Sequence, residues 1–534
     1  MTGRRRALGA LACALALGLP RPADLPAQRR DLSLVVLVAV DQLRPDSLRR
    51  YERQFTGGLR RVIDRAALFD QGRQLHAITE TAPGHATMLS GRVPAGTGIV
   101  TNAFGVEDPD SPFLDNPQVP GASPHRFVGT TLYDWMLAAD TAARALSVSG
   151  KDRGAILPVG RARSDVYWFH DGRFGTSRYY ADTLPAWVEA FNARRSAERL
   201  AGSVWRLLLP ESEYPESDDQ DFETGGANPA FPHPLPATAE QTARLFRYYP
   251  WMDSLTLEFA LEGTARLGLG RRDRPDLLAV ALSATDHVGH DYGPESRELH
   301  DHLLRLDRWL GRFLDSLAAL VPDERTVVVL TSDHGVQPLP EWSRARGRPA
   351  AGRIGLGDLA TSAGEALARR YRVDFGLIFD NGLLVADTLA LHARGVRVDS
   401  LARSLAARAL ARQGVRRVFT PASLRAAPAG DAAATLWRNN LPAGFGWLIA
   451  VNVQPGYVWS GPDDTHAAHG STAPLDLLVP IAFLGPGIRA GRIARAVRTV
   501  DIAPTLAALL GIAPTEPLDG VVLPEIVGTR EARR

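Results

Sequence analysis

Cysteine is almost absent from the sequence, and the single cysteine among its 534 residues, Cys13, lies near the N-terminus. One cysteine cannot form a disulfide within the chain, and it cannot supply the thiolate clusters that hold structural zinc. Any zinc that the protein binds must therefore be held by histidine and carboxylate side chains. Such ligand sets are more typical of catalytic than of structural metal sites.

Long hydrophobic runs are also scarce. The clearest one, Ala7–Leu19, follows three arginines at positions 4–6. Thirteen residues are too few to span a bilayer, but they suit the apolar region of a secretory signal. We therefore predict a signal peptide at residues 1–27 and export to the periplasm or the extracellular space, without stable membrane insertion once the signal is removed. The alternative is that this segment stays attached as a membrane anchor.

The sequence also lacks an excess of charge of either sign. Its formal net charge is +2, and 22% of its residues are charged. Nothing in this balance indicates a surface for nucleic acid or for membranes. The length exceeds that of one typical domain, so we expect a large core with at least one insertion. The segment 338–428, rich in arginine and alanine and helical in pattern, predicts an inserted α+β subdomain within a main domain of residues 28–534.

Four short segments consist almost entirely of apolar residues, as is typical of strands that are buried on both faces. They are Ser33–Val40, Leu277–Leu282, Thr326–Leu330 and Leu477–Leu484. Between them lie stretches with apolar residues at helical spacing, such as 297–320. Strands that alternate with helices predict an α/β fold in which helices sandwich a mostly parallel central sheet.

An aspartate follows each of three predicted strands: Asp41, Asp286 and Asp333. In open α/β sheets ligands bind beyond the carboxyl ends of the strands, so we expect these carboxylates at one rim of the sheet. Together they would repel one another unless a cation lay between them. The alternative is that each aspartate only caps the helix that follows it.

Histidines accompany these aspartates. His334 directly follows one of them, His290 lies four residues after another, and His469 lies shortly before the last predicted strand. Three carboxylates and three imidazoles suit a pair of zinc ions. His466 lies in the same loop as His469 and is the alternative ligand there.

A candidate nucleophile lies in the segment Thr79–His85, between an extended stretch and a helix-like one. Thr81 is expected near the N-terminus of that helix, where backbone N–H groups and the helix dipole favour an anion. A threonine hydroxyl is a weak nucleophile unless a metal or a base lowers its pKa. The alternative role for Thr81 is that of an ordinary helix cap.

These motifs occur in the order found in the alkaline phosphatase superfamily, which the chain resembles over nearly all of its length beyond the predicted signal. The superfamily includes alkaline phosphatases and type I phosphodiesterase/nucleotide pyrophosphatases. The matching segments are Asp41, Thr81–His85, Asp286–His290, Asp333–Gly335, His469–Gly470 and Thr499–Thr505.

The resemblance implies two zinc ions, with the Thr81 hydroxyl as the nucleophile and as a ligand of one of them. His469 is preferred to His466 because Gly470 and Ser471 after it match the family pattern. The implied ligands of one zinc and then of the other are Asp286, His290 and His469, and Asp41, Asp333, His334 and Thr81.

Lysine is as scarce as cysteine, because Lys151 is the only lysine among 61 basic residues. This exception favours a site that needs a compact ammonium group; the alternative is that a single lysine occurs at this position by chance. A monoester dianion carries more charge on its non-bridging oxygens than a diester, so extra cationic groups favour a phosphomonoesterase. The chain resembles the phosphate-irrepressible alkaline phosphatases, in which an asparagine and a Lys-x-Arg pair accompany a threonine nucleophile. Here those residues are Asn102, Lys151 and Arg153.

The resemblance therefore implies a zinc-dependent hydrolase of small-molecule phosphate monoesters that acts through a covalent phosphothreonine intermediate. Asn102, Lys151 and Arg153 would bind the phosphoryl oxygens. A phosphodiesterase or nucleotide pyrophosphatase with the same two-zinc site is the nearest alternative. A sulfatase is disfavoured, because the nucleophile segment offers Thr81 and the only cysteine lies in the predicted signal. A non-catalytic phosphate-binding protein is the alternative from outside the enzymes.

Overall fold

The computed structural model describes residues 32–114, 116, 118–226, 228–460, 464 and 466–528. The predicted signal peptide and Cys13 lie outside the described residues. In the part of the chain that the structure describes, no helix is long and apolar enough to cross a membrane.

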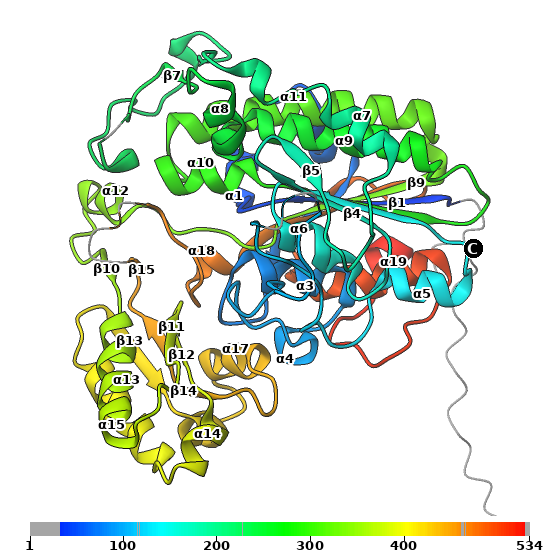
Figure 1. The fold of residues 1–534 in the computed structure, drawn as a ribbon. Coiled ribbons are helices and arrows are strands. Elements are labelled where there is room, and N and C mark those ends of the chain that lie inside the picture. Colours follow the sequence, from blue (N-terminus) through cyan, green and yellow to red (C-terminus); the bar gives the residue numbers. More distant parts are fainter. Residues whose placement is uncertain are drawn as a thin grey trace, which may run out of the picture.

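A large mixed sheet forms the centre of the molecule, with strand order β17-β2-β16-β9-β1-β8-β3-β4-β5 and β18 paired to β2 (Figure 1). Most neighbouring strands are parallel, and β16 is antiparallel to both β9 and β2. The predicted α/β fold with a mostly parallel sheet is thereby confirmed. The strands are β1 (Leu34–Val40), β2 (Ala67–Arg73), β3 (Ala145–Ser149), β4 (Asp165–His170), β5 (Arg173–Gly175), β8 (Asp276–Leu282), β9 (Thr326–Thr331), β16 (Leu478–Leu484), β17 (Gly491–Ile493) and β18 (Val497–Arg498).

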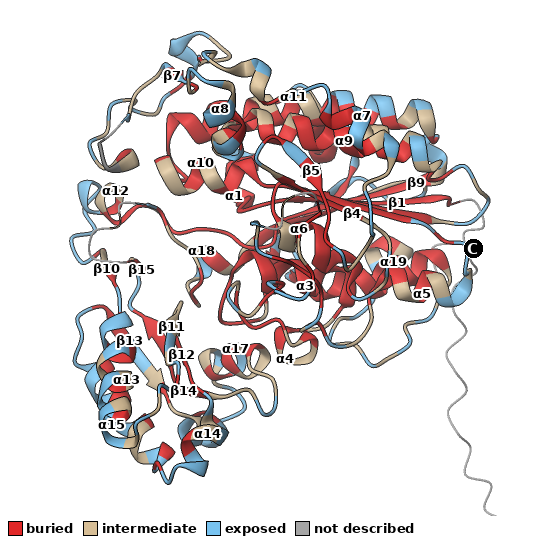
Figure 2. Cartoon of the chain, viewed as in Figure 1, coloured by how far each residue is buried: buried red, intermediate tan, exposed pale blue. Residues whose placement is uncertain are grey.

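Helices cover both faces of this sheet. The sequence of β1 is apolar throughout because both faces of the strand are buried. Val36 and Val38 pack on one face of the sheet, and Val35 and Leu37 pack on the other. One face carries α1 (Pro45–Arg50), α2 (Gly58–Arg65), α7 (Ala186–Asn192), α9 (Trp251–Leu267), α10 (Ala284–Tyr292) and α11 (Arg297–Leu320). The other carries α3 (Thr81–Ser90), α5 (Leu132–Ala139), α6 (Asp152–Ile156), α19 (Ile502–Leu510) and α20 (Pro524–Val527). Figure 2 shows the sheet as the buried centre between these layers.

A second unit, residues 352–459, lies beside the main domain (Figure 1). It contains an antiparallel sheet of order β11-β12-β14-β13 with its own apolar core. The expected bounds of 338–428 stay a prediction; the residues that share this core run from Ile354 to Trp459. Its elements are β10 (Gly352–Ile354), α13 (Gly357–Tyr371), β11 (Ile378–Asp380), β12 (Leu383–Val385), α14 (Thr388–Ala393), α15 (Val398–Leu410), β13 (Val415–Phe419), α16 (Pro421–Ala426), α17 (Ala432–Asn440), β14 (Trp447–Val453) and β15 (Tyr457–Trp459).

Short elements connect these parts. Helix α12 leads from the main sheet toward the second unit, and α18 leads back from it into β16 (Figure 1). The remaining short elements are α4 (Pro94–Thr97), β6 (Val204–Trp205), β7 (His233–Pro234), α8 (Ala239–Leu245), α12 (Pro340–Ala345) and α18 (Pro474–Leu477).

Candidate active site

The strand register brings the three predicted aspartates to one rim of the sheet. β1 pairs in parallel with β9 and with β8, and the pairs Ala39–Thr331 and Val40–Leu282 lie at the ends of these ladders. Asp41 follows β1 directly and Asp333 lies two residues after β9, while Asp286 lies in the first turn of α10, which follows β8. Parallel strands end at the same edge, so the three carboxylates converge there.

Asp41, Asp333 and His334 form what we call the strand-end group. Each offers a ligand atom within 4.8 Å of the others, and all three residues are at most 1% exposed. The Nε2 atom of His334 lies 3.4 Å from Oδ1 of Asp41 and 3.5 Å from Oδ2 of Asp333. Among the described residues these three buried atoms have no hydrogen-bond partner. Buried polar atoms without partners are rare, and together they fit a bound cation.

The protonation of this group also indicates that it needs a bound cation. Burial and then the neighbouring carboxylates of Asp286 and Asp333 raise the pKa of Asp41 to about 7. Burial is also the main cause that raises the pKa of Asp333 to about 6 and lowers that of His334 to about 4. A divalent cation would offset the penalty on the two carboxylates, because it favours their ionised form, and it would bind the neutral imidazole that burial already favours at His334.

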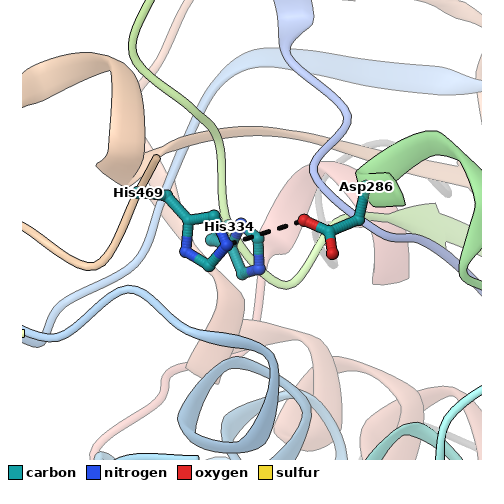
Figure 3. Close-up of side chains that lie close together, drawn as sticks. All are labelled: Asp286, His334 and His469. Atoms are coloured by element: carbon teal, nitrogen blue, oxygen red, sulfur yellow. Dashed lines mark ion pairs between the residues drawn. The ribbon is translucent and has the colours of Figure 1, made fainter. Parts of the chain in front are cut away.

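Asp286, His290 and His469 form what we call the helix-loop group. The Oδ1 atom of Asp286 lies 3.2 Å from Nε2 of His290 and 3.5 Å from Nε2 of His469. The His469 ring stacks on that of His334, with ring centroids 3.7 Å apart, so the two groups adjoin (Figure 3). Asp286, His334 and His469 also offer ligand atoms within 4.8 Å of one another.

Main-chain carbonyls orient the two histidines of the helix-loop group. His290 Nδ1 donates to the carbonyl of Ala467 at 2.5 Å, and His469 Nδ1 donates to that of Thr79 at 2.8 Å. In the neutral form of each ring this bond leaves the lone pair on Nε2, and the two Nε2 atoms lie 3.1 Å apart beside Asp286. Histidines that bind metals are commonly oriented in this way.

His466, the alternative to His469, lies elsewhere. Its Nδ1 is 2.7 Å from Asp464, its Nε2 is 3.4 Å from Asp291, and its side chain is 51% exposed. The structure therefore brings His469 to the helix-loop group and leaves His466 in a surface ion pair.

Thr81 is the first residue of α3 and is 1% exposed. One turn further along α3, His85 Nε2 lies 3.6 Å from Oδ2 of Asp333. A Cβ atom at Gly84 would lie 2.3 Å from the Asp333 carbonyl oxygen, so only glycine allows α3 to approach so closely. The N-terminus of α3 thus packs against the strand-end group. Asn102 is adjacent, because its Oδ1 accepts a hydrogen bond from the amide of Ala82 at 2.8 Å.

Lys151 lies between the two groups. It precedes α6 at the end of β3, and its Nζ is 2.5 Å from Oδ2 of Asp41 and 2.6 Å from Oδ2 of Asp286. Burial disfavours its charge, but Asp286 and Asp41 together raise its pKa above the ordinary value. Arg153, two residues on, contacts Asp152 at 3.4 Å, and its buried Nε has no hydrogen-bond partner among the described residues.

Comparison with known proteins assigns the chain to a family. The sequence profile of the type I phosphodiesterase / nucleotide pyrophosphatase family matches residues 35–349. The chain belongs to this family.

Its relatives in the wider superfamily include alkaline phosphatases that match nearly the whole length of the chain. The chain is 30% identical to alkaline phosphatase PhoV of Synechococcus elongatus, over 95% of each chain. It is 31% identical to alkaline phosphatase PhoK of Sphingomonas sp, over 93% of this chain and 91% of PhoK. The resemblance to the alkaline phosphatase superfamily is confirmed.

The fold agrees with these matches. The crystal structure of alkaline phosphatase PafA superposes with a TM-score of 0.85 at 27% identity, over 93% of this chain and 99% of PafA. A second PafA structure, of a mutant in which a threonine, an asparagine, a lysine and an arginine are substituted, gives a TM-score of 0.84.

In this member of the type I phosphodiesterase family, sequence analysis missed residues that support the two groups. Gln42 adopts a positive φ of 66°, donates its amide N–H to Asp333 at 3.1 Å and donates from its side chain to Asp286 at 2.7 Å. Its place directly after Asp41 was a signal that could have found it. Asp253 accepts from the amide of Ala284 at 2.9 Å, at the N-terminus of α10. No pattern around Asp253 indicates this contact.

Proposed function

We propose that the protein is an alkaline phosphatase: a zinc-dependent hydrolase of small-molecule phosphate monoesters that acts through a phosphothreonine intermediate on Thr81. The observation that carries this proposal is the position of Lys151, whose ammonium group contacts one carboxylate of each group. A cation at this place can bind the third non-bridging oxygen of a monoester dianion. In a diester the corresponding oxygen is esterified and carries no negative charge.

The relatives support the proposal. PhoV, PhoK and PafA are named alkaline phosphatases. In the PafA mutant the substituted threonine and asparagine are as far apart in sequence as Thr81 and Asn102, and the substituted lysine and arginine are spaced as Lys151 and Arg153 are. The same four residue types therefore recur here, with the same spacing within each pair.

We infer that two zinc ions bind here, one at the strand-end group together with the Thr81 hydroxyl and one at the helix-loop group. The donors suit zinc, since all are imidazole nitrogens or oxygens, and the only cysteine, Cys13, lies in the proposed signal peptide. When bound, the metal pair would lower the pKa of the Thr81 hydroxyl and stabilise the charge on the leaving oxygen.

The side chains of the protein then divide the reaction as follows. The Thr81 Oγ releases its proton to solvent and attacks phosphorus in line, and the bond from phosphorus to the leaving oxygen breaks. That oxygen takes up a proton from solvent and departs as the alcohol. Asn102, Lys151 and Arg153 bind the non-bridging oxygens, and the N-terminus of α3 favours their negative charge. Water then attacks the phosphothreonine and releases inorganic phosphate, which restores the Thr81 hydroxyl.

The second candidate is a phosphodiesterase or nucleotide pyrophosphatase with the same ligand set, and the family profile favours it. A diester carries a single negative charge, so it gains less from an additional ammonium group than a monoester dianion does. Lys151 is therefore the residue that distinguishes the two functions.

We also propose that residues 1–27 are a signal peptide and that residues 28–534 form the exported enzyme, in the periplasm or outside the cell. The basic residues 4–6 and the apolar run Ala7–Leu19 support this. Expression of the full chain with N-terminal sequencing of the exported product tests it.

A paired rate assay on the zinc-loaded protein tests the function. We expect kcat/KM for p-nitrophenyl phosphate to exceed that for bis-p-nitrophenyl phosphate. Lys151→Ala should lower the monoester rate by about 100-fold and the diester rate far less, since a charge-assisted hydrogen bond in a dry site is worth roughly 3 kcal/mol.

The matched control is Lys151→Arg, which keeps the charge but replaces the compact ammonium group with a planar fork. It should recover only part of the monoester rate. A wild-type preference for the diester, unchanged in Lys151→Ala, would identify the protein as a phosphodiesterase instead.

A further inference from the structure

The second unit contacts the two segments that lead to Thr81 and to Asn102. Ile78, three residues before Thr81, and Val100, two residues before Asn102, pack in one apolar cluster with Trp437 of α17. Each of these three side chains is at most 1% exposed. The second unit thus packs against the backbone segments that precede Thr81 and Asn102.

Asn440, the last residue of α17, joins these two segments by hydrogen bonds. Its Oδ1 accepts from the amide of Ile78 at 2.9 Å, and its Nδ2 donates to the carbonyl of Val100 at 3.2 Å. The side chain is 0% exposed. One bond needs an acceptor and the other a donor, so the amide orientation is fixed, and an ionised aspartate of the same size could not supply the donor.

Asn381, in the turn between β11 and β12, makes a second link. Its Nδ2 donates to Oε1 of Glu80, and Oε2 of Glu80 accepts from the amide of Asn102 at 2.5 Å. A Cβ atom at Gly470 would lie 2.9 Å from Cγ of Asn381, so the loop that carries His469 also packs against this turn. Asn381 therefore lies between the residue before the nucleophile and the loop of the helix-loop group.

We propose that Asn440 and Asn381 are positioning residues, by which the second unit sets the place of Asn102 relative to Thr81. This rests on the proposed function only in so far as those two residues act on phosphate. The Ala82–Asn102 hydrogen bond depends on the relative position of the backbone before Thr81 and the backbone before Asn102. Asn440 bonds to both of these segments. A displacement of about 1 Å in such a constellation can cost about 100-fold in rate.

The test is a double-mutant cycle of Asn440→Ala with Asn102→Ala, measured as kcat/KM for p-nitrophenyl phosphate and as the Kd for inorganic phosphate. We expect Asn440→Ala alone to lower kcat/KM and phosphate affinity by about tenfold. In the Asn102→Ala background its effect should fall below about twofold, because the contact through which it acts is already gone. Equal effects in both backgrounds would show a merely structural role and overturn the proposal.

Asn439→Ala is the matched control. Asn439 is the neighbour on α17 and donates to the carbonyl of Leu75 at 2.8 Å, farther along the chain from the nucleophile. It should change kcat/KM by less than about twofold in either background. If Asn440→Ala does not fold, the same cycle with Asn381→Ala, at a partly exposed turn, decides the proposal.

Hydrogen exchange separates this inference from the proposed function. In Asn440→Ala, and not in Asn439→Ala, exchange should rise in the peptides that contain residues 78–82 and 100–102. A wild type that neither hydrolyses p-nitrophenyl phosphate nor binds phosphate contradicts the proposed function, and exchange still decides the positioning role. Unchanged exchange in those peptides overturns the positioning role whatever the activity.

Discussion

The strand-end group and the helix-loop group adjoin, but the chain builds them differently. Asp41 and Asp333 lie one and two residues after two central strands, and with His334 they are almost fully buried. The helix-loop group combines two residues of α10 with a loop residue far along the chain, and the side chain of His290 is 29% exposed. One group is fixed by sheet register, and the other by hydrogen bonds from a helix and a loop.

This difference bears on how each group tolerates change. The strand-end residues sit on a parallel ladder buried on both faces, where any shift must move a whole strand. The helix-loop residues depend on single bonds, such as that from His290 to the carbonyl of Ala467. Water can also reach His290 and replace a lost ligand there, whereas it has little access to Asp333.

The largest expected effect comes from removing a ligand of the strand-end group. Asp333→Ala should lower kcat/KM for a phosphate monoester by about 1,000-fold or more, because loss of one metal removes several kcal/mol of charge stabilisation. His290→Ala should cost roughly 10- to 100-fold, since water can fill the vacant coordination position. Steady-state kinetics with zinc content by mass spectrometry measures both.

The zinc content of the two variants distinguishes the loss of a metal ion from the replacement of one ligand by water. We expect Asp333→Ala to retain about one zinc fewer per chain than the wild type, and His290→Ala to bind its full complement at high zinc concentration. If His290→Ala lost more zinc and more activity than Asp333→Ala, burial would not determine which group is more sensitive to the loss of a ligand.

Much of the site could be predicted from the sequence because its residues follow recognisable strands. Asp41 and Asp333 come after apolar runs whose place in a parallel sheet is set by simple patterning. His469 is preferred to His466 because Gly470 and Ser471 follow it, and the structure places the Nε2 atom of His469 beside Asp286. Asn440 could not be found, since its contact with Ile78 joins positions 362 residues apart and no local pattern marks it.

A smaller effect is expected at Asp253, which supports the N-terminus of α10 and so the helix-loop group. Burial, the largest cause, raises its pKa from 3.8 to about 7. The folded protein therefore holds a proton that the unfolded chain releases, so Asp253 lowers the stability progressively as pH rises from about 4 to about 7.

Asp253→Asn should remove this pH dependence. The asparagine is neutral at every pH, and its Oδ1 can still accept from the amide of Ala284. We expect the variant to be more stable than the wild type by about 1–3 kcal/mol at pH 8 and nearly equal at pH 4. Urea unfolding at both pH values measures the difference. An equal change at the two pH values would show that packing, and not ionisation, is responsible.

The smallest effect is expected at His466, although it is only three residues from His469. The hydrogen bond and charge of Asp291, with those of Asp464, raise the pKa of His466 to about 9, so it carries a positive charge at neutral pH and cannot serve as a metal ligand in that form. Its ion pairs are exposed, and such pairs are worth at most about 1 kcal/mol. His466→Ala should therefore change kcat/KM by less than about twofold, whereas His469→Ala should lower it by about 100-fold or more. A large loss in His466→Ala, with reduced zinc content, would mean that the loop rearranges when metal binds and that His466 takes the ligand position.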